Sequence, residues 1–329
     1  MNPYPNSSAN SATINLLGVL VVSLAWGLGG PASHYVTRSL TSSEATFGRC
    51  GIAFLGLLPF LFLNGRKLWS GLSRKGRSLL AASGITLGIH FYFFVSGVAY
   101  ASLSTAVMLV AVEPVLILTV GVIAFKEKLT PSSLLATLAC ILGIMTITLI
   151  PHLSQSINNA SSTRGLGDLA AVLAILTYAF YYWLNRSFQK EEKTISELIP
   201  GSLQRGFSIA SVIYSFAAIT TGILTWFLSP HEPVPSVSTS WTTWAGVIAL
   251  GLIPTILGHT LSQIVSRRAH PIWVSLMSPG ETLMSLLIGF AFLNQQPSSH
   301  ELIGGLMILF GVGIALYGES RTPRPAQIQ

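Results

Sequence analysis

Ten apolar runs, each long enough to cross a membrane as a helix, constrain this chain more than any other feature of its sequence. A helix of about 20 apolar residues spans the hydrocarbon core of a bilayer. The runs cover residues 14–36, 44–63, 78–98, 103–125, 132–150, 167–184, 198–228, 243–263, 272–293 and 300–318. Continuous apolar runs do not fit a membrane β-barrel, whose strands alternate between apolar and polar residues. We therefore expect an all-α polytopic membrane protein with ten transmembrane helices.

The scarcity of charged residues supports this expectation. Of the 329 residues, 50% are hydrophobic and only 9% are charged, whereas soluble domains carry about 25% charged residues. So few charges cannot cover a water-facing surface of this size, and so hydrophobic a chain does not fit a disordered protein. The net charge of +7 does not indicate a nucleic-acid partner, because the basic residues form short clusters between apolar runs and no single patch.

The basic residues also predict the orientation of the chain. With ten spans, both termini and the loops after even-numbered spans share one side of the membrane. That side holds fourteen basic residues, namely Arg66, Lys67, Arg74, Lys75, Arg77, Lys126, Lys128, Arg186, Lys190, Lys193, Arg267, Arg268, Arg321 and Arg324. The other side holds Arg38 and Arg164, while Arg49 and Arg205 fall within spans. Because cytoplasmic loops collect Lys and Arg, we expect both termini to be cytoplasmic.

The second half of the sequence repeats features of the first. A shift of 168 residues places Glu113 on Glu281, and the motifs "TSSE" (41–44) and "TISE" (194–197) each fit a capping box at the start of a helix. Because five is an odd number, a second set of five helices must enter the membrane from the opposite side. Such inverted repeats are typical of secondary transporters. The alternative is a duplicated membrane protein that transports nothing.

The expected organisation has five parts. They are a cytoplasmic N-terminal tail at 1–13, a first five-helix repeat at 14–150, an external linker at 151–166, a second five-helix repeat at 167–318 and a cytoplasmic C-terminal tail at 319–329.

Two segments at equivalent places in the halves carry a family resemblance. They are "AVEPVLILTVGVIAFKEKLTPSSLLATLACILGIMTI" (111–147) and "WVSLMSPGETLMSLLIGFAFLNQQPSSHELIGGLMILFGVGIAL" (273–316). In each, a span with a midpoint proline leads through a polar turn into a span with a late glycine. The pattern resembles the drug/metabolite transporter superfamily, specifically its EamA-type ten-helix members. The resemblance implies two inverted five-helix bundles around a central cavity. It also implies a carrier that moves a small organic metabolite, such as an amino acid or a nucleotide-derived cofactor, across the inner or plasma membrane by alternating access.

Ionisable residues inside the expected spans are the first candidates for a substrate site, because a charge in hydrocarbon costs at least about 2.5–3.5 kcal/mol. Glu113 and Glu281 fall near the midplane of equivalent helices, so an inverted repeat would bring them to one cavity. Arg49, early in the second span, would meet a substrate carboxylate or Glu113 if it points inward, and His90 and His259 are further candidates. Each has a structural alternative: hydroxyl partners for the acids, a bond to a neighbouring helix for the histidines, and extension to the interface for Arg49.

Aromatic residues form a second group of candidates. Trp26 lies in the middle of the first span, Tyr178 and Tyr182 lie one helical turn apart on the sixth, and Tyr92 follows His90 on the third. A cavity lined by rings and a few polar groups suits a planar or amphipathic solute. The alternative is a belt of aromatic residues at the membrane interface.

Enzyme motifs are missing from the sequence. It contains no HExxH, no GxxxxGK and no GxSxG, which argues against a zinc protease, an ATP-driven pump and a serine hydrolase. We therefore expect no enzyme, no cofactor and no metal. The expected partners are a small-molecule substrate and the lipid bilayer, without nucleic acid, and with proton or exchange coupling left open. The alternatives are a non-transporting membrane subunit and a membrane-embedded enzyme.

Overall fold

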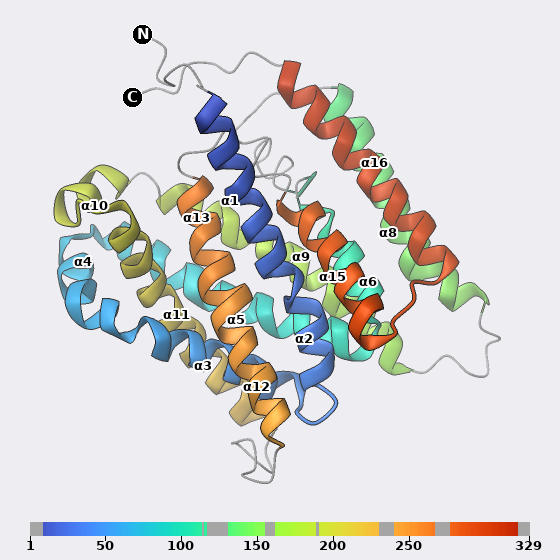
Figure 1. Ribbon diagram of the computed structural model, residues 1–329, viewed down its shortest axis with the longest axis horizontal. Coiled ribbons are helices and arrows are strands. Elements are labelled where there is room, and N and C mark those ends of the chain that lie inside the picture. Colours follow the sequence, from blue (N-terminus) through green and yellow to red (C-terminus); the bar gives the residue numbers. More distant parts are fainter. Residues whose placement is uncertain are drawn as a thin grey trace.

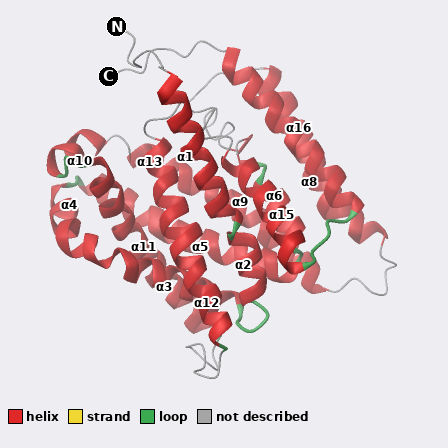
Figure 2. Ribbon diagram, in the orientation of Figure 1, coloured by secondary structure: helices red, strands yellow, loops and turns green. Residues whose placement is uncertain are grey.

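The fold is helical throughout the part of the chain that the structure describes. The computed structural model describes residues 9–113, 115–116, 131–154, 162–188, 191–229, 240–266 and 277–321. Figure 1 shows how the helices are arranged, and Figure 2 shows that no strand occurs among these residues.

The helices follow the apolar runs of the sequence. In the first half they are α1 (Ala9–Gly27), α2 (Gly29–Val36), α3 (Ser42–Phe60), the π-helix η1 (Leu61–Gly65), α4 (Arg66–Gly71), α5 (Arg74–Tyr100), α6 (Leu103–Val110) and α8 (Pro131–Ser154). In the second half they are α9 (Ser162–Phe188), α10 (Glu192–Leu198), α11 (Ser202–Leu228), α12 (Trp241–Leu250), the π-helix η3 (Gly251–His259), α13 (Thr260–Ser266), α15 (Met277–Leu293) and α16 (Ser299–Arg321).

Six helical segments in the described part of the chain are long and apolar enough to cross a membrane. They are Leu17–Val36, Ser42–Gly71, Arg74–Tyr100, Thr163–Phe188, Ser202–Leu228 and Trp241–Val265. Shorter apolar helices, Leu134–Ile147, Met277–Leu293 and Ser299–Ile314, fall in three further expected runs. The remaining expected run, 103–125, lies outside the described residues beyond position 116.

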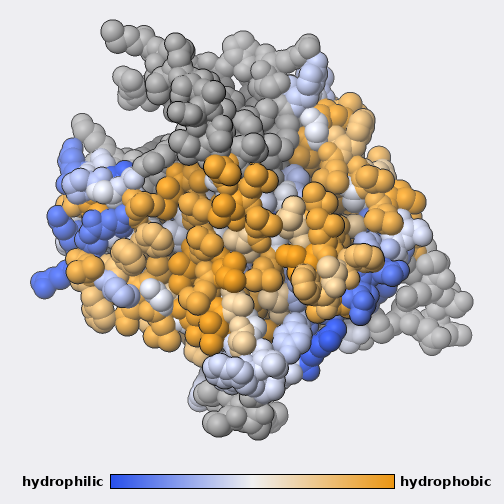
Figure 3. All heavy atoms as spheres, in the orientation of Figure 1, coloured by the Kyte–Doolittle hydropathy of each residue, from blue (hydrophilic) through white to orange (hydrophobic). Residues whose placement is uncertain are grey.

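The surface fits a membrane protein. Figure 3 shows apolar side chains across the middle of one face, with hydrophilic residues gathered at its left and lower-right edges. Large hydrophobic side chains are exposed along many helices, including Leu55, Ile219, Trp226, Phe290 and Phe310. In water, so large an apolar surface would drive aggregation, but in a bilayer it meets lipid.

Two expected spans are interrupted inside the apolar run. The chain turns at Leu28, between α1 and α2, where glycine and proline follow in the sequence "GLGGP" (27–31). The run at 243–263 changes from α12 to the π-helix η3 and back to α13, and η3 contains Pro254. Proline lacks an amide hydrogen and disturbs the helical hydrogen-bond ladder. Both interruptions lie next to the pocket described below.

Helices from the two halves pack against each other. In the first half α1 lies against α15 of the second, α5 against α9, α3 against α11, and α8 against α16 (Figure 1). The last pair approaches closely because Gly143 and Gly304 face each other. A Cβ at either glycine would lie 2.7 Å from the carbonyl oxygen of the other, so a side chain there would push α8 and α16 apart.

One of the two predicted capping boxes is confirmed and the other is wrong. Thr41 caps α3: its Oγ1 accepts from the amide of Glu44, and Oε2 of Glu44 accepts from the amide of Thr41 at 2.7 Å. The motif at 194–197 caps nothing, because it lies within α10. Pro200 and Gly201 then break the helix, and α11 begins only at Ser202.

Candidate functional site

A small buried pocket brings together most of the predicted site residues. Both halves of the chain line it, through Trp26, Gly29, Arg49, His90, Phe91, Phe94, Val110, Glu113, Tyr178, Pro254, His259 and Glu281. The space open to the centre of a water molecule is about 20 Å³, and about 10–15 Å³ suffices for one water. The pocket therefore has room for about one water, and a larger ligand requires the surrounding side chains or helices to move apart.

Arg49 lies inside the fold and does not extend to the membrane interface. Its side chain is only 3% exposed. Its Nε donates to Oγ1 of Thr255 at 2.6 Å, and its guanidinium carbon lies 3.8 Å from the centroid of the Phe91 ring. A cation over an aromatic face is attracted most strongly when both are shielded from water. The hydroxyl and the ring thus hold Arg49 facing the pocket.

The irregular helix η3 supplies the hydroxyl that holds Arg49. Pro254 has no amide hydrogen, so the carbonyl of Leu250 lacks its usual α-helical donor four residues on. Oγ1 of Thr255 donates to that carbonyl at 2.7 Å and accepts from Arg49, while Tyr214 donates its hydroxyl to the carbonyl of Thr255 at 3.0 Å. Irregular helical turns of this kind are frequent at functional sites. Here the turn links Arg49 to α11.

Aromatic rings form one wall of the pocket. The ring centroids of Trp26 and His259 are 5.0 Å apart, those of Phe91 and His259 also 5.0 Å, and those of His90 and Tyr178 5.1 Å. These spacings lie within the range of favourable aromatic contacts. The rings come from α1, α5, α9 and η3, so the pocket wall joins helices that are distant in the sequence.

Gly258 leaves room for the indole of Trp26. A Cβ at this glycine would lie 2.5 Å from Cδ1 and 2.8 Å from Nε1 of Trp26, closer than real Cβ atoms approach other heavy atoms. Trp26 is 5% exposed, and its Nε1 is buried without an acceptor among the described residues. The pocket thus contains an indole donor with no partner in the described part of the protein.

The two predicted acids both reach the pocket but differ in their contacts. Glu113 is buried and its Oε2 accepts from the hydroxyl of Ser278 at 2.6 Å. Glu281, on α15, is partly exposed and accepts no hydrogen bond from a described residue. Glu113 therefore has the hydroxyl partner that was the structural alternative to a binding role. The Glu281 carboxyl has no such partner among the described residues and is available to a ligand.

His90 is bonded to a neighbouring helix. Its Nδ1 lies 2.9 Å from the carbonyl oxygen of Ala174 on α9. A carbonyl only accepts, so Nδ1 carries the proton and donates. The bond fixes the ring against α9 through Nδ1, and Nε2 is the ring nitrogen that this bond does not use.

Tyr92 and Tyr182 do not line the pocket, unlike the other candidates. Successive helical residues are rotated by about 100°, so Tyr92 lies about 200° around α5 from His90, and its ring instead neighbours Phe93 at 5.6 Å. Tyr182 shares a face with Tyr178 but lies one turn further along α9. These two tyrosines are therefore not part of the candidate site.

Several contributors escaped the sequence analysis. Thr255 and Ser278 are common residue types in apolar runs, and only their contacts with Arg49 and Glu113 distinguish them. Phe94 lies four residues after His90 and could have been found from helical spacing. Pro254, a proline inside an apolar run, was the strongest unused signal.

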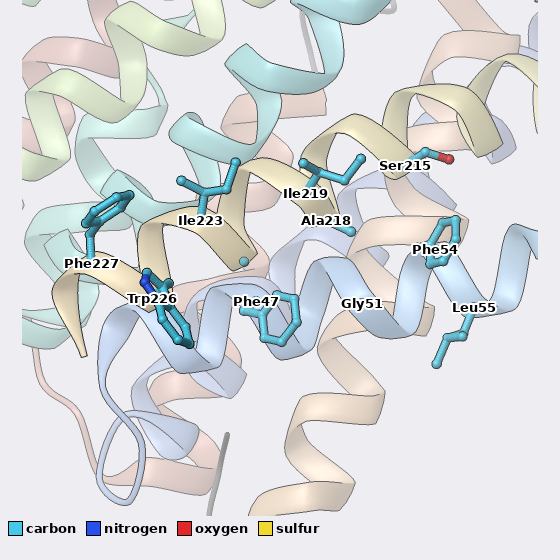
Figure 4. Close-up of a pocket in the computed structure, with 11 residues that line it drawn as sticks. Phe47, Gly51, Phe54, Leu55, Ser215, Ala218, Ile219, Ile223, Trp226 and Phe227 are labelled. Carbon is cyan, nitrogen blue, oxygen red and sulfur yellow. The ribbon is translucent and has the colours of Figure 1, made fainter. Parts of the chain in front are cut away.

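A larger apolar groove lies elsewhere on the molecule. The space in this groove that is open to the centre of a water molecule is about 660 Å³. The groove runs between α3 and α11 (Figure 4). Its lining consists of Phe47, Gly51, Phe54, Leu55, Ser215, Ala218, Ile219, Gly222, Ile223, Trp226 and Phe227. Its lining contains no ionisable side chain, and several of its residues are exposed on the apolar surface. We therefore place the candidate site in the smaller pocket, where charged groups meet.

Comparison with known proteins gives a family for this site. Residues 13–149 match the EamA-like transporter family. An uncharacterized transporter of Bacillus subtilis, YxxF, is 24% identical over 325 residues, which is 96% of this chain and 94% of the relative. A WAT1-related protein of Arabidopsis thaliana is 23% identical and covers 83% of this chain and 76% of its own length. The chain belongs to the drug/metabolite transporter superfamily.

Two further similarities concern the fold and one region of this transporter. A solved crystal structure shares its fold with a TM-score of 0.57 at 18% identity, covering 96% of this chain and 100% of the other. A purine permease of Arabidopsis thaliana is 28% identical over 151 residues, or 44% of this chain and 43% of the permease. The protein is thus a multi-pass membrane transporter whose buried pocket is the candidate site.

Proposed function

We propose that this transporter is a secondary carrier with ten transmembrane helices in the inner or plasma membrane of the cell. The proposal has two inverted five-helix repeats at 14–150 and 167–318, an external linker between them, and cytoplasmic tails at 1–13 and 319–329. Two observations support it. The basic residues gather in the loops that this arrangement makes cytoplasmic. In Figure 1, α1 begins and α16 ends on the same side of the molecule, as an even number of spans requires.

The proposed substrate site is the buried pocket. The observation that carries this proposal is the meeting of three ionisable side chains, Arg49, Glu113 and Glu281, in one pocket between helices of both halves. Ionisable residues inside membrane helices commonly mark a solute pathway. Trp26, His90, Tyr178 and His259 complete the proposed site.

Alternating access is the proposed mechanism. The pocket has room for about one water, which corresponds to a state closed to both sides. Rocking of the helices of one repeat against those of the other would open it to each side in turn. The interruptions at Leu28 and in η3 lie beside the pocket, where bending would change its access. The solute is a small organic metabolite, and coupling to protons or exchange for a second solute are both compatible with this site.

Counterflow in proteoliposomes tests the carrier. The purified full-length chain is reconstituted, loaded with an unlabelled solute and exposed to the same labelled solute, over amino acids, nucleobases, sugars and organic acids. A carrier accumulates label transiently above the level of protein-free liposomes. A non-transporting subunit gives no accumulation with any compound. A membrane-embedded enzyme gives chemically altered label, which chromatography of the vesicle contents detects.

A further inference from the structure

A group of basic side chains covers one edge of the molecule, away from the buried pocket. The stretch 66–77 contains five basic residues and no acidic residue. Four of them, Arg66, Lys67, Arg74 and Lys75, are exposed and form what we call the basic patch. Hydrophilic side chains gather in Figure 3 along the edge where Figure 1 places α4 and α10. No ion pair joins the basic patch to a carboxylate in the described part of the chain, so its charges are available to an anion.

The core fixes the helix that presents the first half of the basic patch. The opposite face of α4 is buried, with Leu68 0% and Leu72 3% exposed. Between them, the ring of Trp69 lies 5.9 Å from the ring of Phe216 on α11, measured between centroids. The first two cations of the patch therefore extend from a helix whose buried side is packed in the protein.

Two exposed apolar side chains lie one helical turn before these cations. Phe62 is 79% exposed and Leu63 is 74% exposed, both on η1. Residues four apart are neighbours on a helix surface, so Phe62 falls near Arg66 and Leu63 near Lys67. The apolar pair ends the run at 44–63, and the cations follow directly outside it. This order, apolar and then cationic, matches the acyl chains and the phosphate of a phospholipid.

The second half of the basic patch lies where cations are unfavourable. Arg74 and Lys75 stand in the first turn of α5, which contains no acidic residue, and a helix N-terminus favours anions and disfavours cations. The start of neighbouring α10 brings Glu191, whose carboxylate accepts from the hydroxyl of Ser73, the cap of α5. Glu197 is exposed on the same helix. These two carboxylates do not balance the four cations of the patch, so an anionic ligand would reduce their mutual repulsion.

We propose that the basic patch, together with Phe62 and Leu63, is a binding site for an anionic phospholipid. The cations contact the phosphate, and the acyl chains lie along the two apolar side chains. This site is separate from the transport pocket. The proposed membrane arrangement places it on the cytoplasmic side, where the lipid surface is negative. Each Lys or Arg near such a surface strengthens binding about fivefold, and a lipid without net charge gains less from these cations.

Three compounds test the site on the purified full-length protein in neutral detergent. They are phosphatidylglycerol, phosphatidylcholine with the same acyl chains, and sn-glycerol 3-phosphate, which has the phosphate without the chains. Native mass spectrometry counts the bound molecules, and thermal shift gives their relative affinities. We expect phosphatidylglycerol to bind about tenfold or more tightly than either other compound. Raising the salt from about 50 mM to about 500 mM should weaken this preference, because salt screens exposed charges.

Paired charge variants locate the site. Arg66→Gln combined with Lys67→Gln should weaken binding of phosphatidylglycerol about tenfold or more and change binding of phosphatidylcholine less than about twofold. Arg38→Gln combined with Arg164→Gln is the matched control. It removes the same charge from the segment after α2 and from α9, outside the basic patch. The control should bind both lipids as the wild type does.

A second pair tests the apolar part of the site. Phe62→Ser combined with Leu63→Ser should weaken binding of both lipids, because the acyl chains lose their contact. Unchanged binding of both lipids in this variant would contradict the acyl-chain contact and overturn the two-part site.

Other results would also overturn the proposal. They are equal binding of the two lipids by the wild type, binding of sn-glycerol 3-phosphate as tightly as phosphatidylglycerol, and equal losses in the patch and control variants. Should the variant at Arg66 and Lys67 not fold, Arg74→Gln combined with Lys75→Gln gives the same test with the same expected loss. Lipid binding is measured without transport, so a negative counterflow result would count against the carrier and leave this site standing.

Discussion

Thr255 shows how one ordinary residue can support a charged site. Its hydroxyl donates to the carbonyl that Pro254 leaves without an α-helical donor, and the same oxygen accepts from Arg49. One oxygen atom of Thr255 thus both donates to the Leu250 carbonyl and orients the guanidinium of Arg49. Neither role can be recognised from its residue type, because threonines in apolar helices commonly bond their own backbone, as Thr220 does.

Replacing Thr255 with valine should affect both stability and binding. Valine keeps the shape but removes the hydroxyl, so the Leu250 carbonyl and Arg49 Nε both lose a partner. We expect a loss of about 1–3 kcal/mol in stability and weaker binding of any solute that contacts Arg49. Thermal unfolding and binding in detergent measure both effects.

Two control variants accompany this experiment. Thr255→Ser keeps the hydroxyl and should recover most of the stability and binding. Thr225→Val removes a buried hydroxyl that donates to the Ser43 carbonyl, and neither residue lines the pocket, so it should lower stability while sparing solute binding. If Thr255→Val binds solute like the wild type, Arg49 does not depend on η3.

The aromatic wall gives a second prediction at this scale. Tyr178 contacts His90 and Trp26, so Tyr178→Ala should enlarge the pocket and weaken solute binding about tenfold. Trp241→Ala is the comparison, because Trp241 is 77% exposed and fits an interfacial belt. With protein amounts matched in the uptake measurement, equal losses in the two variants would contradict a role for Tyr178 in the pocket.

Hydropathy predicted where helices run but not where they break. The described residues of the apolar runs are helical except at Leu28, 111–112 and 199–201, because a run of about 20 apolar residues leaves the backbone no other way to satisfy its polar groups in lipid. The π-helix η3 and the turn at Leu28 coincide with Pro254 and with the glycines and proline of "GLGGP" (27–31), which a hydropathy pattern does not register. The "TISE" motif fits the spacing of a capping box but lies within α10, and Pro200 and Gly201 place the start of α11 at Ser202.

The candidate site was predictable to a similar extent. Ionisable residues in apolar helices stand out in a sequence, and Arg49, Glu113 and Glu281 do reach one pocket. Adjacency to His90 predicts Tyr92 near the pocket, but the rotation of the helix places it outside the pocket lining. The partners of the charged groups are ordinary hydroxyls, so only coordinates reveal them.

Contact between α8 and α16 is sensitive to side-chain size. Gly143→Leu or Gly304→Leu inserts a side chain where a Cβ would already lie 2.7 Å from the facing carbonyl. We expect each to lower stability by about 1–3 kcal/mol through overpacking, measured as a fall in the unfolding temperature. Gly313→Leu is the control on the same helix, since no atom lies within 4 Å of a Cβ at that position. Equal falls in all three variants would mean that the close approach is not responsible.

At the scale of the whole molecule, the arrangement in the membrane is open to direct test. Reporter fusions after Lys75, Lys190 and Arg268 should report the cytoplasm, and fusions near Asn159 and Pro233 should report the outside. The reason is the division of basic residues between the two sets of loops. A cytoplasmic report at Asn159 would contradict the ten-span count and, with it, the inverted repeat.

The size of the buried pocket has an electrical consequence. A membrane potential of about 100 mV acts on a unit charge with about 2.3 kcal/mol, so any continuous file of water through the protein would carry a leak current. A pocket with room for about one water interrupts such a file. Proteoliposomes without solute should therefore hold a potassium diffusion potential as long as protein-free vesicles do, as followed with a voltage-sensitive dye. Faster decay would mean that the resting protein conducts, and that the closed pocket is not its dominant state.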